Sequence, residues 1–552
     1  MRRRLTAGAV ATVTGLAFLT TVPGSAQAEP TAVVDYTVVA ADGASATEAV
    51  AAIKAAGGTV VSSNEAVGVY RVTSTDATFE TKATASAALI GASERKAIGY
   101  APNGIEKVEK GLSSAGKGGK GQGPAKSDPL DDKLWGLAMV KADKARKIES
   151  GEKGVTVGVL DTGLDASNPD LAPNFSSKLS KNFAPDIADI DGECEVAGCL
   201  DPVGTDDGGH GTHVAGTIGA ALNGSGVSGV APNVTLVELK GGQDSGYFFL
   251  DPVVNALTYA GDHGIDVVNM SFYVDPWLYN CTANPADSPE AQAEQQAIIT
   301  GMKRALNYAH AKGVTMFGAL GNNHEDLGSP RTDISSPDYG ADPYDRPIDN
   351  STCWDLPVEG PHVIGVSSLG PSGKKSDFSN YGTEQISVSA PGGWYRDGYG
   401  TDTFQTVGNE ILSSYPLKVL QEEGLVDADG NVTDAGSASV FKDCTKAGKC
   451  GYYTYLQGTS MASPHAAGVG ALIVSRYGTP DRRNGGLTLA PDKVEQQLYR
   501  SAAEHACPEP RLQTYTNEGR STEFNAYCSG DKQFNGFYGY GIVDAYAAVG
   551  GH

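Results

Sequence analysis

Three polar residues, far apart in the chain, have the side chains needed for nucleophilic attack on a carbonyl carbon. Asp161 follows the apolar run Val157–Leu160, His210 begins a helical pattern, and Ser460 lies among small residues in Gly458–His465. A serine nucleophile needs a base to remove its proton, and a histidine base needs a carboxylate to orient its ring. These residues therefore predict acyl-transfer chemistry.

The surroundings of Ser460 also suit a developing negative charge. Ser460 stands at the predicted start of a helix, where free backbone N–H groups point toward solvent or a ligand. Asn322 ends another predicted strand and offers an amide donor. Taken singly, an Asp or Asn after a strand is most often a turn former. Together, the four residues predict a nucleophile, a base, an orienting acid and an oxyanion donor.

Metal-dependent chemistry is the competing interpretation, and the ligand spacing does not favour it. His210 and His213 are three residues apart, without a Glu between them or a third ligand. His324–Glu325 lacks the second His of a zinc-peptidase helix. The segment Asp186–Gly192 has Ile at a ligand position of a calcium loop. The chemistry requires no cofactor; structural calcium is possible, with its ligands unassigned.

Alternating strand-like and helical runs from residue 128 to 552 predict an α/β fold, a mostly parallel sheet with helices on both faces. In such a sheet, functional residues gather at the carboxyl ends of the strands.

Three polar insertions enlarge the predicted domain; they fall near 274–290, 323–352 and 417–453. The expected strands are 155–160, 234–239, 267–270 and 314–317, and the expected helices are 211–222, 253–263 and 292–311.

Three segments precede this domain. Residues 1–28 combine three arginines, an apolar stretch and Ala26-Gln27-Ala28, which predicts a signal peptide; the alternative is a membrane anchor. Residues 29–110 predict a small α+β domain, with a capping box at Ser45 and Glu48. Residues 111–127 are rich in Gly and Lys and predict a flexible linker, since no Gly-Lys-[Ser/Thr] phosphate loop is present.

Charge and cysteine content restrict the environment and the partners. The net charge of −23 argues against nucleic acid binding. After the predicted signal peptide, no segment is long and apolar enough to span a membrane. Eight cysteines in an exported chain predict disulfides and a secreted, extracellular protein. Spacing alone does not fix the connectivity, but pairing of near neighbours predicts Cys194–Cys199, Cys444–Cys450, Cys507–Cys528 and Cys281–Cys353.

The segments around Asp161, His210 and Ser460 resemble the three signature motifs of the subtilases, the subtilisin-like serine peptidases, in that family's order. The resemblance extends from about Trp135 to Ala545. It implies that Ser460 is the nucleophile, His210 the general base and then acid, and Asp161 the residue that orients His210. The backbone N–H of Ser460 and the side-chain amide of Asn322 would form the oxyanion hole.

The resemblance also implies where substrate binds. Extended substrate would pair with Ser271-Phe272-Tyr273 and with Gly246, in Asp244–Tyr247. The family often has Gly where Tyr273 stands, which predicts an altered rim of the first specificity pocket. Asp355 falls near the floor of that pocket, and an acidic floor would favour Lys or Arg before the scissile bond.

By position and pattern, residues 29–110 resemble the subtilase propeptide, which assists folding and inhibits the enzyme until it is removed. We expect maturation between Lys117–Lys126 and Asp128, and a monomer acting on protein or peptide substrates. Two alternatives remain at this point: a selective processing protease with access narrowed by the insertions, and a relative that binds peptides without cutting them.

Overall fold

The computed structural model describes residues 33–94, 127–338 and 343–551. A seven-stranded parallel sheet forms the centre of the large domain, in the order β15-β14-β10-β8-β5-β7-β6. The predicted α/β class is confirmed. The strands are β5 (Thr156–Asp161), β6 (Lys181–Asn182), β7 (Thr235–Lys240), β8 (Val267–Met270), β10 (Thr315–Ala319), β14 (Val363–Leu369) and β15 (Val388–Pro391).

Helices cover the sheet on both faces, so its central strands are continuous apolar runs rather than alternating ones. One buried cluster joins the sheet to α6 (His210–Gly219), α10 (Thr459–Tyr477) and α11 (Pro491–Ser501). The other joins it to α7 (Leu250–His263) and α8 (Pro289–Ala311). Helix α10 is buried along almost its whole length, as expected of a helix without a polar face.

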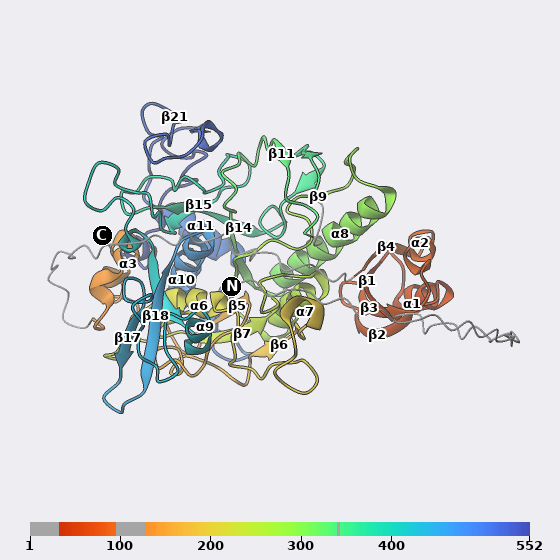
Figure 1. Cartoon of the computed structure of the whole chain (residues 1–552), viewed down its shortest axis with the longest axis horizontal. Helices are drawn as coiled ribbons and strands as arrows, with labels where there is room; N and C mark the ends of the chain where they lie inside the picture. Colours follow the sequence, from red (N-terminus) through yellow and green to blue (C-terminus); the bar gives the residue numbers. More distant parts are fainter. Residues whose placement is uncertain (1–32, 95–126, 339–342, 552) are drawn as a thin grey trace, which may run out of the picture.

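A small antiparallel domain precedes the large one and lies against α7 and α8 at one side of the molecule (Figure 1). Its sheet has the order β2-β3-β1-β4, and the predicted capping box at Ser45 is present. The predicted signal segment and nearly all of the predicted linker lie outside the described residues. The elements are β1 (Val34–Ala40), α1 (Ala46–Ala55), β2 (Thr59–Asn64), β3 (Val69–Ser74), α2 (Phe79–Thr84) and β4 (Leu89–Glu94).

The insertions carry short elements and disulfides. The insertion at 417–453 contains α9 and β17, and β17 pairs with β18 beside β16. All four predicted disulfides are present. Among the described residues, no helix is both long and apolar enough to cross a lipid bilayer. The bounds here are β9 (Asn280–Cys281), β11 (Thr332–Asp333), β12 (Arg346–Pro347), β13 (Cys353–Trp354), β16 (Ile411–Tyr415), α9 (Leu417–Glu422), β17 (Phe441–Cys444) and β18 (Cys450–Leu456).

Short elements complete the large domain. Before β5 and between β6 and α6 lie α3 (Trp135–Met139), α4 (Ala142–Ala145) and α5 (Ala188–Asp191). The C-terminal part contains β19 (Thr479–Pro480), β20 (Leu487–Thr488), β21 (Leu512–Gln513), β22 (Ala526–Tyr527) and α12 (Ala545–Ala548).

Candidate active site

The predicted site residues meet at one edge of the parallel sheet. Asp161 is the last residue of β5, Ser271 follows β8, and Asn322 lies three residues beyond β10. Strands β5, β8 and β10 are neighbours, so their carboxyl ends lie side by side. The sheet therefore brings together residues that are widely separated in the sequence, as expected for a parallel sheet.

Asp161 and His210 form a buried hydrogen-bonded pair. Nδ1 of His210 lies 2.7 Å from Oδ1 of Asp161, and the same oxygen accepts a 2.8 Å bond from the Thr162 N–H. Burial alone would lower the pKa of His210, but the Asp161 carboxylate raises it, and the net shift is upward from 6.5. With Nδ1 engaged, Nε2 is the nitrogen left to exchange a proton with a reacting group.

The second histidine of this helix has a structural role. His213 is fully buried, and its Nε2 donates to the carbonyl oxygens of Ile411 and Thr454, at 2.9 and 3.2 Å. Burial lowers its pKa to about 3, so the ring stays neutral. His213 therefore anchors α6 to β16 and β18 and does not join His210 at a metal site.

Ser460 is the second residue of α10 and is partly exposed. The preceding Gly458 has φ of +152°, in the region that favours glycine, and this turns the chain from β18 into the helix. The Ser460 hydroxyl donates to the Ser271 carbonyl at 3.2 Å, and the Ser271 hydroxyl donates back to the Ser460 carbonyl at 3.1 Å. Within the described chain, no hydrogen bond joins Ser460 to His210.

Thr459 orients the amide of Asn322. The Asn322 Oδ1 accepts two 2.7 Å bonds from Thr459, one from its N–H and one from its hydroxyl. This leaves the Asn322 Nδ2, for which the described residues offer no acceptor, as a donor for a ligand. The sequence analysis did not identify Thr459 as the residue that orients Asn322. The signal that could have pointed to it is a hydroxyl side chain directly before Ser460.

The predicted substrate residues lie together around His210. Gly246 and the segment Ser271–Tyr273 line one small cleft with His210. The Phe272 ring stacks on Phe248, with centroids 3.9 Å apart, which holds this edge in place. Tyr273 is partly buried, and its hydroxyl donates to Asp338 at 2.8 Å. The Tyr273 side chain is therefore tied to the 323–352 insertion.

Asp355 lies close to Gly321: a Cβ atom added to Gly321 would be 3.4 Å from Oδ2 of Asp355. The side chain is 3% exposed. Burial raises the pKa of Asp355 well above its usual range, and the nearby Glu359 and Asp333 carboxyls add to this. Asp355 therefore lies among other acidic groups, and the preference for Lys or Arg before the scissile bond stays a prediction.

A larger cavity of about 850 Å³ adjoins Asn322 on the other side of the site. Its walls come from the 323–352 insertion and from the C-terminal segment near Phe524. The sequence analysis connected the insertion with access to the site, but not the C-terminal segment. The Phe524 ring stacks on His324, with centroids 4.0 Å apart. The lining includes Leu278, Tyr279, Asn322, His324, Glu325, Arg331, Ile334, Phe378, Gln457, Arg520 and Phe524.

Comparisons with known proteins agree with this geometry. The family model described as the subtilase family matches residues 152–541. Subtilisin DY of Bacillus licheniformis is 29% identical over 347 residues, which cover 62% of this chain and 85% of that protein. Fervidolysin of Fervidobacterium pennivorans is 28% identical over 364 residues, 63% of this chain but only 39% of that protein.

Solved structures agree on the fold. An epidermin leader peptide processing serine protease from Staphylococcus aureus aligns with a TM-score of 0.59 and 21% identity, over 94% of this chain and 98% of that one. The match to the family model covers more than half of this chain. The chain therefore belongs to the subtilase family and is a subtilisin-like serine endopeptidase.

Proposed function

We propose that this chain is an exported endopeptidase, made as an inhibited precursor, in which Ser460, His210 and Asp161 act as the catalytic triad. The observation that carries the proposal is the buried 2.7 Å bond between Asp161 and His210, placed at the same sheet edge as Ser460. The four disulfides suggest an extracellular location, and the predicted signal peptide is in accord with export.

In the first half-reaction, the Ser460 Oγ attacks the carbonyl carbon of the substrate while Nε2 of His210 takes its proton. A rotation about the Cα–Cβ bond of Ser460 moves the hydroxyl from the Ser271 carbonyl toward His210; such bonds are often unmade before substrate binds. The Asp161 carboxylate stabilises the imidazolium that results. The C–N bond then breaks, and His210 gives its proton to the leaving amine.

In the second half-reaction, water attacks the acyl-enzyme ester. His210 removes a proton from the water, the C–Oγ bond breaks, and the proton returns to Ser460. The oxyanion in both halves would be held by the Asn322 Nδ2 and the backbone N–H of Ser460. Since Thr459 already fixes the Asn322 amide, this donor needs little reorganisation when charge develops.

The 29–110 domain is proposed to act as the inhibitor in the precursor. Arg304 on α8 donates to the carbonyl oxygens of Ala40 and Val67, at 3.0 and 3.1 Å, and pairs with Asp42. Ser93 on β4 donates to Glu294 at 2.8 Å. The described part of the domain ends at Glu94, which lines a small cavity together with Asp275. Asp275 lies two residues beyond Tyr273, so the described part of this domain ends beside the proposed substrate edge.

A second candidate is selective processing of a precursor protein or peptide, as the name of the Staphylococcus aureus neighbour says of that protease. The supporting observation is the tethering of Tyr273 to Asp338 of the 323–352 insertion, which restricts the rim of the site. A peptide library cleaved by the purified enzyme, with Ser460→Ala as control, tests both candidates. Cleavage at many unrelated sequences favours a general protease, cleavage at few favours processing, and cleavage by the control variant would refute both.

A further inference from the structure

A second carboxylate lies behind the pair formed by Asp161 and His210. Asp206 precedes His210 by four residues, and it is 3% exposed. Within the part of the chain that the structure describes, five hydrogen-bond donors point to its two oxygens. The donors are the Thr162 hydroxyl, the N–H groups of Gly208 and Gly209, and the N–H and hydroxyl of Thr212. Bonds from so many donors stabilise a carboxylate in its charged form.

Asp206 supplies the cap that helix α6 otherwise lacks. The first N–H groups of a helix have no partner inside it, and Gly209, which precedes α6, has no side chain to bind them. Thr212 is the third residue of the helix, and its N–H donates to Oδ2 of Asp206 at 2.8 Å. The Gly209 N–H donates to Oδ1 at 2.9 Å. Asp206 therefore fixes the first turn of α6, which His210 begins.

Thr162 joins Asp206 to the other member of the pair. It directly follows Asp161 at the end of β5 and is fully buried. Its N–H donates to Oδ1 of Asp161 at 2.8 Å, and its hydroxyl donates to Oδ1 of Asp206 at 2.9 Å. The same hydroxyl accepts a 3.1 Å bond from the Gly211 N–H in α6. The end of β5 and the start of α6 are thus fastened to one carboxylate.

Ionisable groups from several elements face Asp206. They are Asp165 beyond β5, Glu238 and Lys240 on β7, Tyr415 on β16 and His210 on α6. Burial raises the pKa of Glu238 to about 8, so this group is mostly protonated at neutral pH. Burial also raises the pKa values of Asp165 and Tyr415. Glu238 and Tyr415 therefore add little charge near Asp206 at neutral pH.

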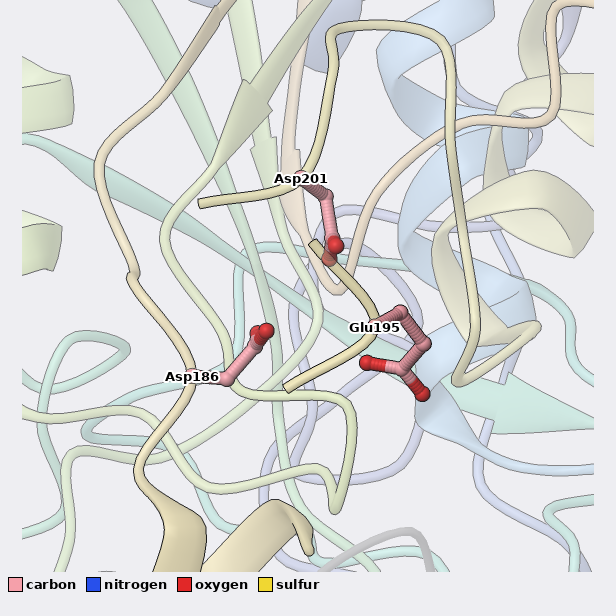
Figure 2. Close-up of side chains that lie close together, drawn as sticks. All are labelled: Asp186, Glu195 and Asp201. Atoms are coloured by element: carbon pink, nitrogen blue, oxygen red, sulfur yellow. The ribbon is translucent and has the colours of Figure 1, made fainter. Parts of the chain in front are cut away.

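Lys240 is the lysine among these groups, and other carboxylates share it. Its ammonium group is buried, lies 3.2 Å from Oδ2 of Asp201 and also pairs with Asp244. Figure 2 shows Asp201 together with its acidic neighbours Asp186 and Glu195. Because Asp201 and Asp244 engage Lys240, the negative charge of Asp206 is left to act on His210.

We propose that Asp206 is a positioning residue for the reaction: it fixes the first turn of α6 against the end of β5 and so holds His210 on Asp161. This role rests on the proposed function of His210 as the base. The 2.7 Å bond between Asp161 and His210 must persist while the imidazolium forms and decays. A carboxylate bonded to both sides of the pair limits the movement of one against the other.

The charge of Asp206 adds an electrostatic consequence to this position. Burial lowers the pKa of His210, the Asp161 carboxylate raises it, and the charge of Asp206 raises it further. Loss of that charge should therefore lower the pKa of His210. A role confined to holding the fold together would leave this pKa unchanged, so the pH dependence of the reaction separates the two roles.

The test compares the pH dependence of kcat/KM in variants made in the full-length chain and assayed after secretion. Asp206→Asn removes the charge and keeps the size of the side chain. Asp207→Asn is the matched control, because it removes the same charge one residue away, where the carboxylate lies 2.8 Å from Lys418. Thr162→Val removes the hydroxyl between the two carboxylates, and Thr162→Ser keeps it. Thermal unfolding of each variant reports whether it folds.

We expect Asp206→Asn to lower kcat about tenfold with little change in KM, because Asp206 lies behind His210 and does not line the substrate cleft. The acid limb of its pH profile should move to lower pH, though less far than in Asp161→Asn, since Asp161 contacts the ring directly. Asp207→Asn should keep the wild-type limb. Thr162→Val should also lose rate, and Thr162→Ser should restore most of it.

An acid limb of Asp206→Asn that coincides with the wild-type limb would overturn the proposal, as would equal displacement of the limb in Asp206→Asn and Asp207→Asn. Both results leave the assignment of His210 as the base intact. If Asp206→Asn does not fold, the Thr162 variants decide, and a wild-type rate in Thr162→Val overturns the proposal. Absence of peptide hydrolysis by the wild type would overturn the proposed function, and this role with it.

Discussion

Nδ1 of His210 lies 2.7 Å from Oδ1 of Asp161, although 49 residues separate them in the sequence. The carboxylate raises the pKa of His210 against the effect of burial. The base must be neutral to accept the serine proton, so kcat/KM should rise with pH as His210 loses its proton. Because that pKa is above 6.5, we expect the half-maximal point of the acid limb above pH 6.5, measured on a neutral peptide substrate.

Asp161→Asn tests the source of this shift. The substitution removes the anion that raises the pKa and favours the wrong tautomer of His210, so kcat should fall about 10⁴-fold. The acid limb of the residual activity should move to lower pH, since burial then dominates. A pH profile of Asp161→Asn that coincides with that of the wild type would contradict this account of the pair.

Asn322→Ala should lower kcat by about 10²–10³-fold with little change in KM, a range known from subtilisin itself. The reason is that the Asn322 Nδ2 would bind the oxyanion more strongly than the carbonyl of the bound substrate. Steady-state kinetics on one peptide substrate measure both constants. Asn323→Ala is the matched control and should stay close to wild type; a rise in KM alone for Asn322→Ala would indicate a role in substrate binding only.

Thr459→Val should reduce kcat by a smaller factor, about tenfold, because it removes one of the two bonds that orient Asn322. Thr459→Ser keeps the hydroxyl and should restore most of the rate. If Thr459→Val keeps the wild-type rate while Thr459→Ser loses activity, the methyl packing of Thr459 matters rather than its hydrogen bond.

Arg304→Ala in the full-length precursor should speed release of the N-terminal domain, roughly tenfold, because it removes three contacts with that domain. Time courses of processing, followed by electrophoresis, measure the effect. Lys303→Ala serves as the control, because it removes the same charge from the same helix. The Lys303 side chain lies over the Trp354 ring and not against the N-terminal domain. Equal release rates in the two variants would argue against the proposed inhibitory contact.

The sequence predicted the α/β class and the strands β5, β7, β8 and β10, because buried strands and helices have distinct patterns of apolar residues. Strands β6, β14 and β15 were not predicted. The four disulfides followed from pairing cysteines with their near neighbours. The sequence also predicted that Asp161 and Asn322 lie at one edge of the sheet, since parallel strands end at a common edge; their catalytic roles stay predictions. The Thr459–Asn322 bonds could not be predicted, because they depend on how α10 sits against β10.

The surroundings of Asp355 could not be predicted from the sequence either. The resemblance placed Asp355 near the floor of the first specificity pocket, but it could not show that burial and neighbouring carboxyls raise the pKa of this group.

Labelling with a fluorophosphonate probe tests the central claim most directly. The matured enzyme is treated with the probe, digested and analysed by mass spectrometry to locate the modified residue. We expect one adduct, on Ser460. It should be absent in Ser460→Ala, and it should form much more slowly in His210→Ala, where no base removes the serine proton. Peptide hydrolysis by an enzyme that carries no adduct on Ser460 would contradict the assignment of the nucleophile. Labelling of His210→Ala at the wild-type rate would contradict the assignment of the base.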